Sequence, residues 1–360
     1  MAADDRGPRV RRLDLALVGF GHVGRRLVSL LDERADRLAG DHGVATRVVG
    51  IATARHGAAF DANGLDWRRA LALVEGGGRL DALDDRAAGP APADAIALIE
   101  RLAGVGGVPV VVETTILDVE RGQPAIDHVR AGLAAGADIV TANKGPVAIA
   151  YRALRAEAEA AGRAFLFEGA VMDGVPIFNL ARHTLPAVTI RGFRGVVNST
   201  TNHILTAMEA GRPFEEALAE MQRAGVAEAD PWLDVDGWDA AAKTAALVNV
   251  LMDGDLTPQA VDRTGIGPES ADAARDAVGR GLRLRLVASA ERRGDAVAAR
   301  VAPELLPASD PLASLRGQAN ALILRTDLLG EVAITQLDGS LTATAYALVS
   351  DLVEVRRRLG

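Results

Sequence analysis

Lysine is almost absent from this chain, and the two positions that keep it are the first candidates for chemistry. Of the 40 basic residues, 38 are arginine, and the two lysines are Lys144 and Lys243. An arginine guanidinium stays protonated at any accessible pH, whereas a lysine can be tuned by burial and can donate or accept a proton. Chance survival of two surface lysines is the competing interpretation. The motif-like surroundings of both residues argue against chance, because Thr141-Ala-Asn-Lys144 follows an apolar strand and Asp239-Ala-Ala-Ala-Lys243 lies in an apolar helix.

The second lysine ends a segment rich in carboxylates that runs from Gly225 to Lys243. Its acidic residues are Glu228, Asp230, Asp234, Asp236 and Asp239. Asp239 and Lys243 are four residues apart on a predicted helix, so they share one face. A surface ion pair of this kind would contribute only a few tenths of a kcal/mol, yet alanine and aliphatic residues leave the helix little other polar surface. We therefore expect a partly buried lysine, held by a carboxylate, that serves as a proton donor.

A polar turn from Gly195 to Ile204 could complete a substrate pocket. Small hydroxyl and amide side chains gather there, at the point where a strand is expected to pass into a helix. Such a turn can present hydrogen-bond donors to the carboxylate of an amino acid. Asn198 and Thr200 are therefore candidates for substrate binding.

A glycine motif near the N-terminus indicates a dinucleotide site. The apolar run Leu13–Val18 leads directly into Gly19-Phe-Gly21-His-Val-Gly24, after which leucines recur at helical spacing. This strand, turn and helix context makes the pattern specific, because the glycines let backbone N–H groups reach a pyrophosphate at the start of the helix. A tight turn without a ligand is the less favoured alternative. The residues assigned to the cofactor here are Gly19, Gly21, His22, Val23 and Gly24.

The end of the second predicted strand favours NADP over NAD. In dinucleotide folds an acidic residue at this place binds the ribose 2′-hydroxyl, whereas an arginine accommodates a 2′-phosphate. Here residues 47–52 run into Thr53-Ala-Arg55-His56, and the next acidic residue is Asp61. Arg55 could bind the phosphate through two hydrogen bonds. A solvated arginine on a loop is an equally open interpretation, which keeps NAD as an alternative.

The elements that must position these residues alternate between strands and helices. Apolar strands are predicted at 13–18, 47–52, 109–113 and 138–141, with helices at 93–103 and 126–135. This order is typical of an α/β fold with an N-terminal, Rossmann-like, doubly wound parallel sheet. Residues 57–92 are interpreted as an irregular or partly helical insertion. We also assign Thr114 and Asn143, which follow two of these strands, to the cofactor site.

The pattern changes at Tyr151 to strands and long helices in a less regular order, which indicates a second, α+β domain. We predict a cofactor-binding domain at 1–150 and a substrate domain at 151–335. The remaining residues, 336–360, are expected to form a helix that packs back on the first domain.

Composition excludes several classes of function. The net charge of -8 and the lack of a basic block argue against a nucleic-acid surface. The chain has no cysteine, which removes disulfides, thiolate catalysis and cysteine-bound zinc. No apolar run is long enough to span a membrane, and residues 4–9 lack the apolar core of a signal peptide. We expect a cytoplasmic enzyme that acts on a small molecule.

Taken together, these motifs resemble homoserine dehydrogenase. The matching segments lie between residues 19 and 243 in the family's order and are GFGHVG, TANKGP, EGAVMDGVP, NSTTNHIL and AEADPxxDVDGxDAAAK. The last two are specific to the family. The resemblance implies NAD(P)-dependent interconversion of L-homoserine and L-aspartate 4-semialdehyde, on the route to threonine and methionine. It also implies a homodimer built through the second domain.

The resemblance assigns roles to individual residues. Lys243 would transfer the proton with Asp239 orienting it, and Lys144 would contact the substrate and the nicotinamide. Glu228 and Asp239 would hold the amino and hydroxyl end of the substrate, with Asp234 as a supporting carboxylate. The loop after Glu168 resembles the family's site for a monovalent cation, Na⁺ or K⁺. Its ligands would be the Glu168 side chain and the backbone oxygens of Val171, Asp173 and Val175.

Two departures from the family pattern leave alternatives open. Val226 stands where an aromatic residue is usual, and the glycine-rich turn near Gly339 is reduced. The chain could therefore be a related NAD(P)-dependent reductase with a different, amino-acid-like substrate. A nucleotide-binding regulatory protein without turnover is the second alternative, but a pure binder has no need of titratable lysines. Because the chain stops at Gly360, no regulatory amino-acid-binding domain is expected after it.

Overall fold

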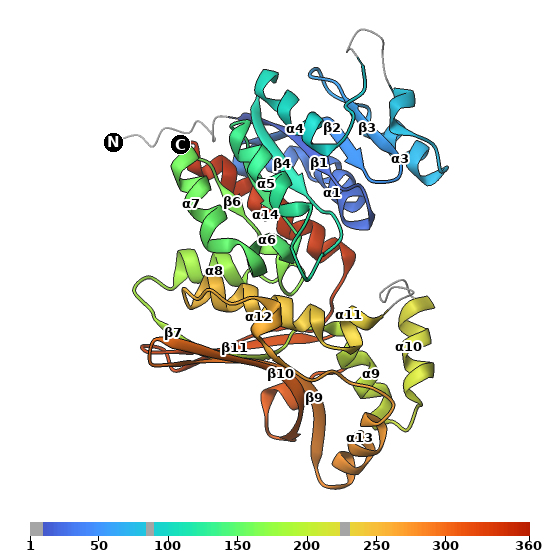
Figure 1. The fold of residues 1–360 in the computed structure, drawn as a ribbon, viewed down its shortest axis with the longest axis vertical. Helices are drawn as coiled ribbons and strands as arrows, with labels where there is room; N and C mark the ends of the chain where they lie inside the picture. Colours follow the sequence, from blue (N-terminus) through green and yellow to red (C-terminus); the bar gives the residue numbers. More distant parts are fainter. Residues whose placement is uncertain (1–9, 84–89, 224–230) are drawn as a thin grey trace.

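The described residues form two β-sheets, one in the upper and one in the lower half of Figure 1. This computed structural model describes residues 10–83, 90–223 and 231–360. The N-terminal tail, Val226 and Glu228 lie outside the described residues, so the interpretations that rest on them stay predictions. Within the described ranges, no helix is both long and apolar enough to cross a bilayer.

The first sheet carries the glycine motif. Its strands lie in the order β3 (Gly57–Phe60), β2 (Val44–Thr53), β1 (Arg11–Val18), β4 (Val108–Glu113), β5 (Asp138–Thr141) and β6 (Phe165–Leu166). Strands β2, β1, β4, β5 and β6 run parallel, which confirms the predicted doubly wound sheet. Strand β3 pairs antiparallel with β2, because the two are joined by a short turn that reverses the chain.

The predicted insertion at 57–92 is more regular than expected. Its described residues contribute the edge strand β3, helix α3 (Trp67–Glu75) and a 3₁₀ turn at Leu80–Leu83. Strand β3 has the sequence Gly-Ala-Ala-Phe, which contains no β-branched residue and so carries little strand signal.

Helices cover both faces of the first sheet, as its continuous apolar strands require. Leu13, Leu15 and Leu17 of β1 pack in one apolar cluster with α1 and α14, whereas Ala16 and Val18 pack in another with α4 and α5. The helices of this half are α1 (His22–Glu33), α2 (Ala35–His42), α4 (Ala95–Glu100), α5 (Ala125–Ala134), α6 (Lys144–Ile149), α7 (Tyr151–Ala161) and α14 (Leu341–Arg358).

Two parts of the chain join the first half from beyond residue 150, where we expected the domain boundary, and the second of them, α14, lies within residues 336–360, which we expected to pack there. Strand β6 extends the sheet past β5. Helix α14 lies against α1, and its Arg356 donates a hydrogen bond to the Gly43 carbonyl oxygen at 3.2 Å. The first structural unit therefore includes residues from both ends of the described chain.

The second sheet is mainly antiparallel. Its strands lie in the order β12 (Glu331–Gln336), β11 (Asn320–Thr326), β7 (Ile190–Val196), β9 (Leu282–Arg293), β10 (Ala296–Pro307) and β8 (Asp262–Arg263). Its helices are α8 (Ile177–Thr184), α9 (Ser199–Glu209), α10 (Phe214–Arg223), α11 (Trp232–Val235), α12 (Trp238–Leu251) and α13 (Ser270–Gly279). Short 3₁₀ turns occur at Glu168–Ala170, Pro258–Ala260 and Pro311–Ser314.

Helix α12 connects the two halves. It packs on β9 and β10 of the second sheet and, on its other side, against α6 of the first half (Figure 1). Its sequence is rich in alanine, which lets neighbouring elements approach closely, and residues Ala240 to Ala242 are buried. This packing brings the helix that bears Lys243 against the helix that begins at Lys144.

Candidate active site

The two lysines meet at one carboxylate between the halves of the molecule. Lys144 Nζ lies 3.2 Å from Asp239 Oδ1, and Lys243 Nζ lies 2.9 Å from Asp239 Oδ2. Lys243 also donates a hydrogen bond to the Val197 carbonyl oxygen at 2.7 Å. The side chains of Asp239 and Lys243 are each 13% exposed. The sequence predicted the Asp239–Lys243 pair, but nothing in it indicated that Lys144 would share the same carboxylate.

Asn198 holds the acidic side of this cluster. Its Nδ2 donates to Asp234 Oδ1 at 2.7 Å and to Asp239 Oδ2 at 2.9 Å. Its Oδ1 accepts the Thr201 backbone N–H at 2.8 Å and so caps helix α9. The amide is thereby fixed between the helix and the two carboxylates. Thr200, the other predicted member of this turn, is buried in the first turn of α9.

The charges of the cluster depend on one another. Burial alone would raise the pKa of Asp239, but the ammonium groups of Lys243 and Lys144 outweigh it and hold that pKa below its ordinary value. Burial alone would lower the pKa of Lys243, but the carboxylates of Asp239, Asp173 and Asp234 together raise it. Burial and the neighbouring Asp239 carboxylate raise the pKa of Asp234. Lys243 is therefore an ammonium at neutral pH, able to donate a proton.

The glycine turn has the close packing that a pyrophosphate site requires. Gly19 has a φ of +94°, and a Cβ there would lie 2.6 Å from the Thr114 carbonyl oxygen. A Cβ on Gly24 would lie 2.9 Å from the Gly19 carbonyl oxygen. Helix α1 begins at His22, so its free backbone N–H groups point toward this turn. Larger residues would push the helix away from the turn.

Helix α6 starts at Lys144 and is capped by the residue before it. Asn143 Oδ1 accepts the Gly145 backbone N–H at 2.9 Å, and its Nδ2 donates to the Thr115 carbonyl oxygen at 3.1 Å. Asn143 thus joins the lysine helix to the loop after β4, which also contains Thr114. Arg55 lies exposed in the turn between β2 and β3.

The Glu168 loop lies close to the lysines. Glu168 Oε1 and Oε2 each accept a backbone N–H at 2.8 Å, from Phe178 and Asn179. Burial raises the pKa of the Glu168 carboxyl to about 7, although these two hydrogen bonds oppose the shift. Met172 and Asp173 have φ values of 53° and 54°, so the chain bends sharply there. No sequence pattern indicated that the Asp173 carboxylate would raise the pKa of Lys243.

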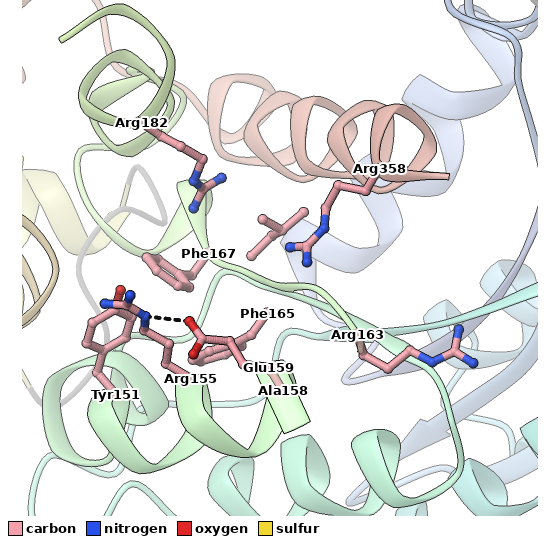
Figure 2. A pocket seen from close by; sticks show the side chains of 10 residues that line it. Tyr151, Arg155, Ala158, Glu159, Arg163, Phe165, Phe167, Arg182 and Arg358 are labelled. Carbon is pink, nitrogen blue, oxygen red and sulfur yellow. Dashed lines mark hydrogen bonds and ion pairs between the residues drawn. The ribbon is translucent and has the colours of Figure 1, made fainter. Parts of the chain in front are cut away.

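A separate pocket of about 240 Å³ lies between α7, β6, α8 and the end of α14 (Figure 2). Phe165 and Phe167 lie in its wall, and Arg155 is paired with Glu159 at 2.9 Å. Neither lysine lines this pocket. This pocket is therefore distinct from the lysine cluster, in which Lys144, Lys243, Asp239, Asp234 and Asn198 lie together.

Comparisons with known proteins agree with this arrangement. Residues 19–168 match a family model described as homoserine dehydrogenase, NAD binding domain, and residues 176–353 match one described as homoserine dehydrogenase. The chain is 36% identical over 345 residues to an NAD(+)-dependent homoserine dehydrogenase of Pseudomonas canavaninivorans, covering 95% of this chain and 96% of the relative.

Two further similarities extend over most of the chain. A homoserine dehydrogenase of Methanocaldococcus jannaschii is 35% identical over 344 residues, covering 95% of this chain and 98% of the relative. The crystal structure of a homoserine dehydrogenase from Thiobacillus denitrificans superposes with a TM-score of 0.80 at 30% identity, covering 97% of this chain and 74% of that one. Since these matches include both halves of the molecule, the chain belongs to the homoserine dehydrogenase family.

Proposed function

We propose that this chain interconverts L-homoserine and L-aspartate 4-semialdehyde with a nicotinamide cofactor. The observation that carries the proposal is the convergence of Lys144 and Lys243 on Asp239, between the glycine-turn half and the second half. When bound, the cofactor supplies or accepts the hydride at the carbon that bears the oxygen. We assign its binding to the glycine turn, Thr114, Asn143 and the start of α6.

In the reductive direction the aldehyde carbon gains a hydride and its oxygen becomes an alkoxide that needs a proton. The Lys243 ammonium stabilises that oxygen and supplies the proton, contributions of about 10²–10⁴-fold for general acid–base catalysis. Asp239 keeps the ammonium in place, and Lys144 orients the carbonyl group. In the oxidative direction neutral Lys243 accepts the hydroxyl proton, so the rate should rise with pH.

The substrate's amino-acid end is proposed to lie on the second half of the molecule. The Asn198–Asp234 hydrogen bond at 2.7 Å supports a fixed acidic wall beside the lysines. Because both Asn198 amide hydrogens are used by carboxylates, we expect Asn198 to position Asp234 and Asp239. Thr200 remains a proposed ligand, and the resemblance of the segment around Glu228 supports that carboxylate as a partner of the substrate's ammonium.

Incubation with L-homoserine and an oxidised nicotinamide cofactor tests this function. We expect reduced cofactor and L-aspartate 4-semialdehyde to form in equal amounts. D-homoserine and L-serine serve as matched controls, because each lacks one feature that the lysine and carboxylate cluster would recognise. Turnover of a control substrate in preference to L-homoserine would contradict the proposal.

We propose that NADP is the preferred cofactor, because Arg55 is exposed at the end of β2 and no carboxylate stands beside it in sequence. Wild type should then show a higher kcat/KM with NADPH than with NADH. Arg55→Asp should raise the KM for NADPH by about 10–100-fold, the equivalent of one charge-assisted hydrogen bond. The same charge change at Arg275, on α13, is the control. It should leave the KM for NADPH and the ratio of kcat/KM between NADPH and NADH unchanged. A wild-type preference for NADH, the cofactor type named for the Pseudomonas relative, would contradict this assignment.

A monovalent cation is proposed to bind at the Glu168 loop, through the Glu168 side chain and the backbone oxygens of Val171, Asp173 and Val175. Oxygen ligands suit such a cation, and each Glu168 oxygen keeps a lone pair beyond its one backbone hydrogen bond. Glu168 is 2% exposed, and no arginine or lysine forms an ion pair with it among the described residues. A bound cation would therefore compensate a buried charge.

The pH dependence of stability checks this cation site. In a buffer without alkali cations, the folded state holds the Glu168 proton up to about pH 7, above the ordinary 4.5. Its contribution to stability, roughly 3 kcal/mol, is present at low pH and is lost as the pH rises between these values. Added K⁺ or Na⁺ should raise Tm above pH 7 and have little effect at pH 5. Glu168→Gln should abolish the cation effect, whereas the exposed Glu159→Gln should keep it; the pH effect should only diminish in Glu168→Gln, because burial also raises the pKa of the neighbouring Asp351. A Tm insensitive to K⁺ and Na⁺ in wild type would contradict the site.

We also propose a homodimer that forms through the second sheet. Ser289 and Glu291 lie on the face opposite to Ala288 and Ala290, which pack with the helices, whereas Val287 on the same face is buried in a small apolar cluster with Leu306 and Leu312. The accessible part of that face, with Ser289 and Glu291, lines a pocket of about 500 Å³, which supports it as the contact surface. Light scattering should give twice the mass of the chain, and the mass of a monomer would contradict the proposal.

We assign the enzyme to the cytoplasm and to the route toward threonine and methionine.

A further inference from the structure

We propose that Glu113 is a positioning residue that fixes Lys144 and the loop after β4 through a buried hydrogen-bond network. Glu113 is the last residue of β4, and its side chain is fully buried. It touches neither lysine and is absent from the catalytic assignments made above. The inference rests on the proposed role of Lys144, because Glu113 would act through that residue.

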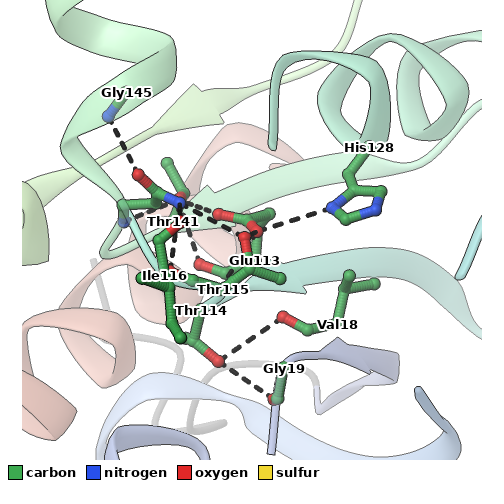
Figure 3. A network of polar contacts seen from close by, with 10 residues as sticks. Val18, Gly19, Glu113, Thr114, Thr115, Ile116, His128, Thr141 and Gly145 are labelled. Carbon is green, nitrogen blue, oxygen red and sulfur yellow. Dashed lines mark hydrogen bonds and ion pairs between the residues drawn. The ribbon is translucent and has the colours of Figure 1, made fainter. Parts of the chain in front are cut away.

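The Glu113 carboxylate joins the ends of two neighbouring strands (Figure 3). Oε1 accepts the Thr115 backbone N–H at 3.1 Å and a hydrogen bond from the Thr115 hydroxyl. Oε2 lies 3.1 Å from the hydroxyl of Thr141, the last residue of β5, and shares the proton of that hydroxyl with the Glu113 carbonyl oxygen at 3.0 Å. A carboxylate can accept all of these bonds at once, because it has only acceptor sites when ionised.

From Thr141 the network continues to the lysine helix. The Thr141 hydroxyl accepts the Asn143 backbone N–H at 2.9 Å, and Asn143 caps α6 through Gly145. Asn143 also donates to the Thr115 carbonyl oxygen, which closes a ring that begins and ends at Glu113. Lys144 is the first residue of that capped helix, so its backbone position follows from this ring.

The residue between Glu113 and Thr115 contacts the glycine turn. Thr114 donates its backbone N–H to the Val18 carbonyl oxygen at 2.7 Å and its hydroxyl to the Gly19 carbonyl oxygen at 3.0 Å. Because Thr114 lies between Glu113 and Thr115 in the chain, the carboxylate that holds Thr115 would also fix Thr114 beside the glycine turn. The position of Thr114 relative to Lys144 matters, since a displacement of about 1 Å can cost about 10²-fold in rate.

Glu113→Gln tests the proposal, because the side chain keeps its shape but one acceptor becomes a donor that faces the Thr115 or Thr141 hydroxyl. We expect kcat to fall by about 10–100-fold. Asp14→Asn is the matched control. Asp14 is also fully buried on the same sheet, but near the opposite end of β1, where it pairs with Arg47 at 2.8 Å and accepts the Gly107 N–H. Both variants should lower Tm, yet Asp14→Asn should keep the wild-type kcat.

A double-mutant cycle with Lys144→Ala identifies the route of the effect. If Glu113 acts through Lys144, Glu113→Gln should reduce kcat far less in the Lys144→Ala background than in wild type. Thr141→Val, which removes only the linking hydroxyl, should reproduce the loss and replaces Glu113→Gln if that variant does not fold.

Three results would overturn the inference. The first is a wild-type kcat in both Glu113→Gln and Thr141→Val, with Lys144→Ala impaired; the proposed function then stands without the positioning role. The second is a fold-loss in kcat on Glu113→Gln that is as large in the Lys144→Ala background as in wild type. The third is a wild-type kcat in Lys144→Ala, which overturns the proposed role of Lys144 and with it the claim that Glu113 acts through Lys144.

Discussion

Lys243→Arg is expected to keep the fold and nucleotide binding and to lose at least about 10²-fold in kcat, the lower end of general acid–base contributions. The substitution preserves the positive charge beside Asp239, so electrostatic stabilisation of the cluster survives. It removes the group that can lose its proton, because a guanidinium does not deprotonate in proteins. Steady-state rates in both directions and cofactor titration by fluorescence provide the measurement.

Lys144→Arg is the informative companion to this variant. Lys144 shares the same carboxylate, at 3.2 Å, but is proposed to orient the substrate without transferring a proton. We therefore expect Lys144→Arg to retain more activity than Lys243→Arg. If Lys243→Arg folds, binds cofactor and turns over near the wild-type rate, Lys243 is not the proton-transfer residue.

Asp239→Asn is expected to have the second large effect, on both stability and pH dependence. Removing one partner of a buried ion cluster costs about 3–5 kcal/mol, because the remaining charges lose their compensation. The amide also leaves burial to dominate the environment of Lys243, whose pKa should then fall. The rise of homoserine oxidation with pH should therefore shift to lower pH in this variant, at a reduced maximum rate.

Urea unfolding and a pH–rate profile check this prediction, with Asp236→Asn as control. Asp236 lies three residues away and is exposed, so its variant should change stability by only about half a kcal/mol and leave the profile in place. An Asp239→Asn profile that coincides with wild type would mean that Asp239 does not set the charge of Lys243.

Local sequence signals predicted much of this site. The glycine turn, the i,i+4 pair of Asp239 and Lys243 and the polar turn at Asn198 each occupy a few consecutive residues, where spacing determines geometry. The parallel order of the main strands followed from their continuous apolar character.

Features that depend on long-range packing could not be predicted in this way. Lys144 and Asp239 are brought together by the contact of α6 with α12, which no local pattern encodes. The ring around Glu113 joins residues from two strand ends, and a single buried glutamate in an apolar strand gave no signal for it. Strand β3 and the extension of the first sheet by β6 were missed because both strands are short.

The most direct test of the account follows the transferred hydride. Reduced cofactor that carries deuterium at its transferable position is incubated with wild-type enzyme and L-aspartate 4-semialdehyde, and the product is analysed by mass spectrometry. The account predicts L-homoserine with one deuterium on the carbon that bears the hydroxyl, and almost none from Lys243→Arg under the same conditions. Unlabelled homoserine, or the absence of any homoserine from a folded, cofactor-binding enzyme, would contradict it.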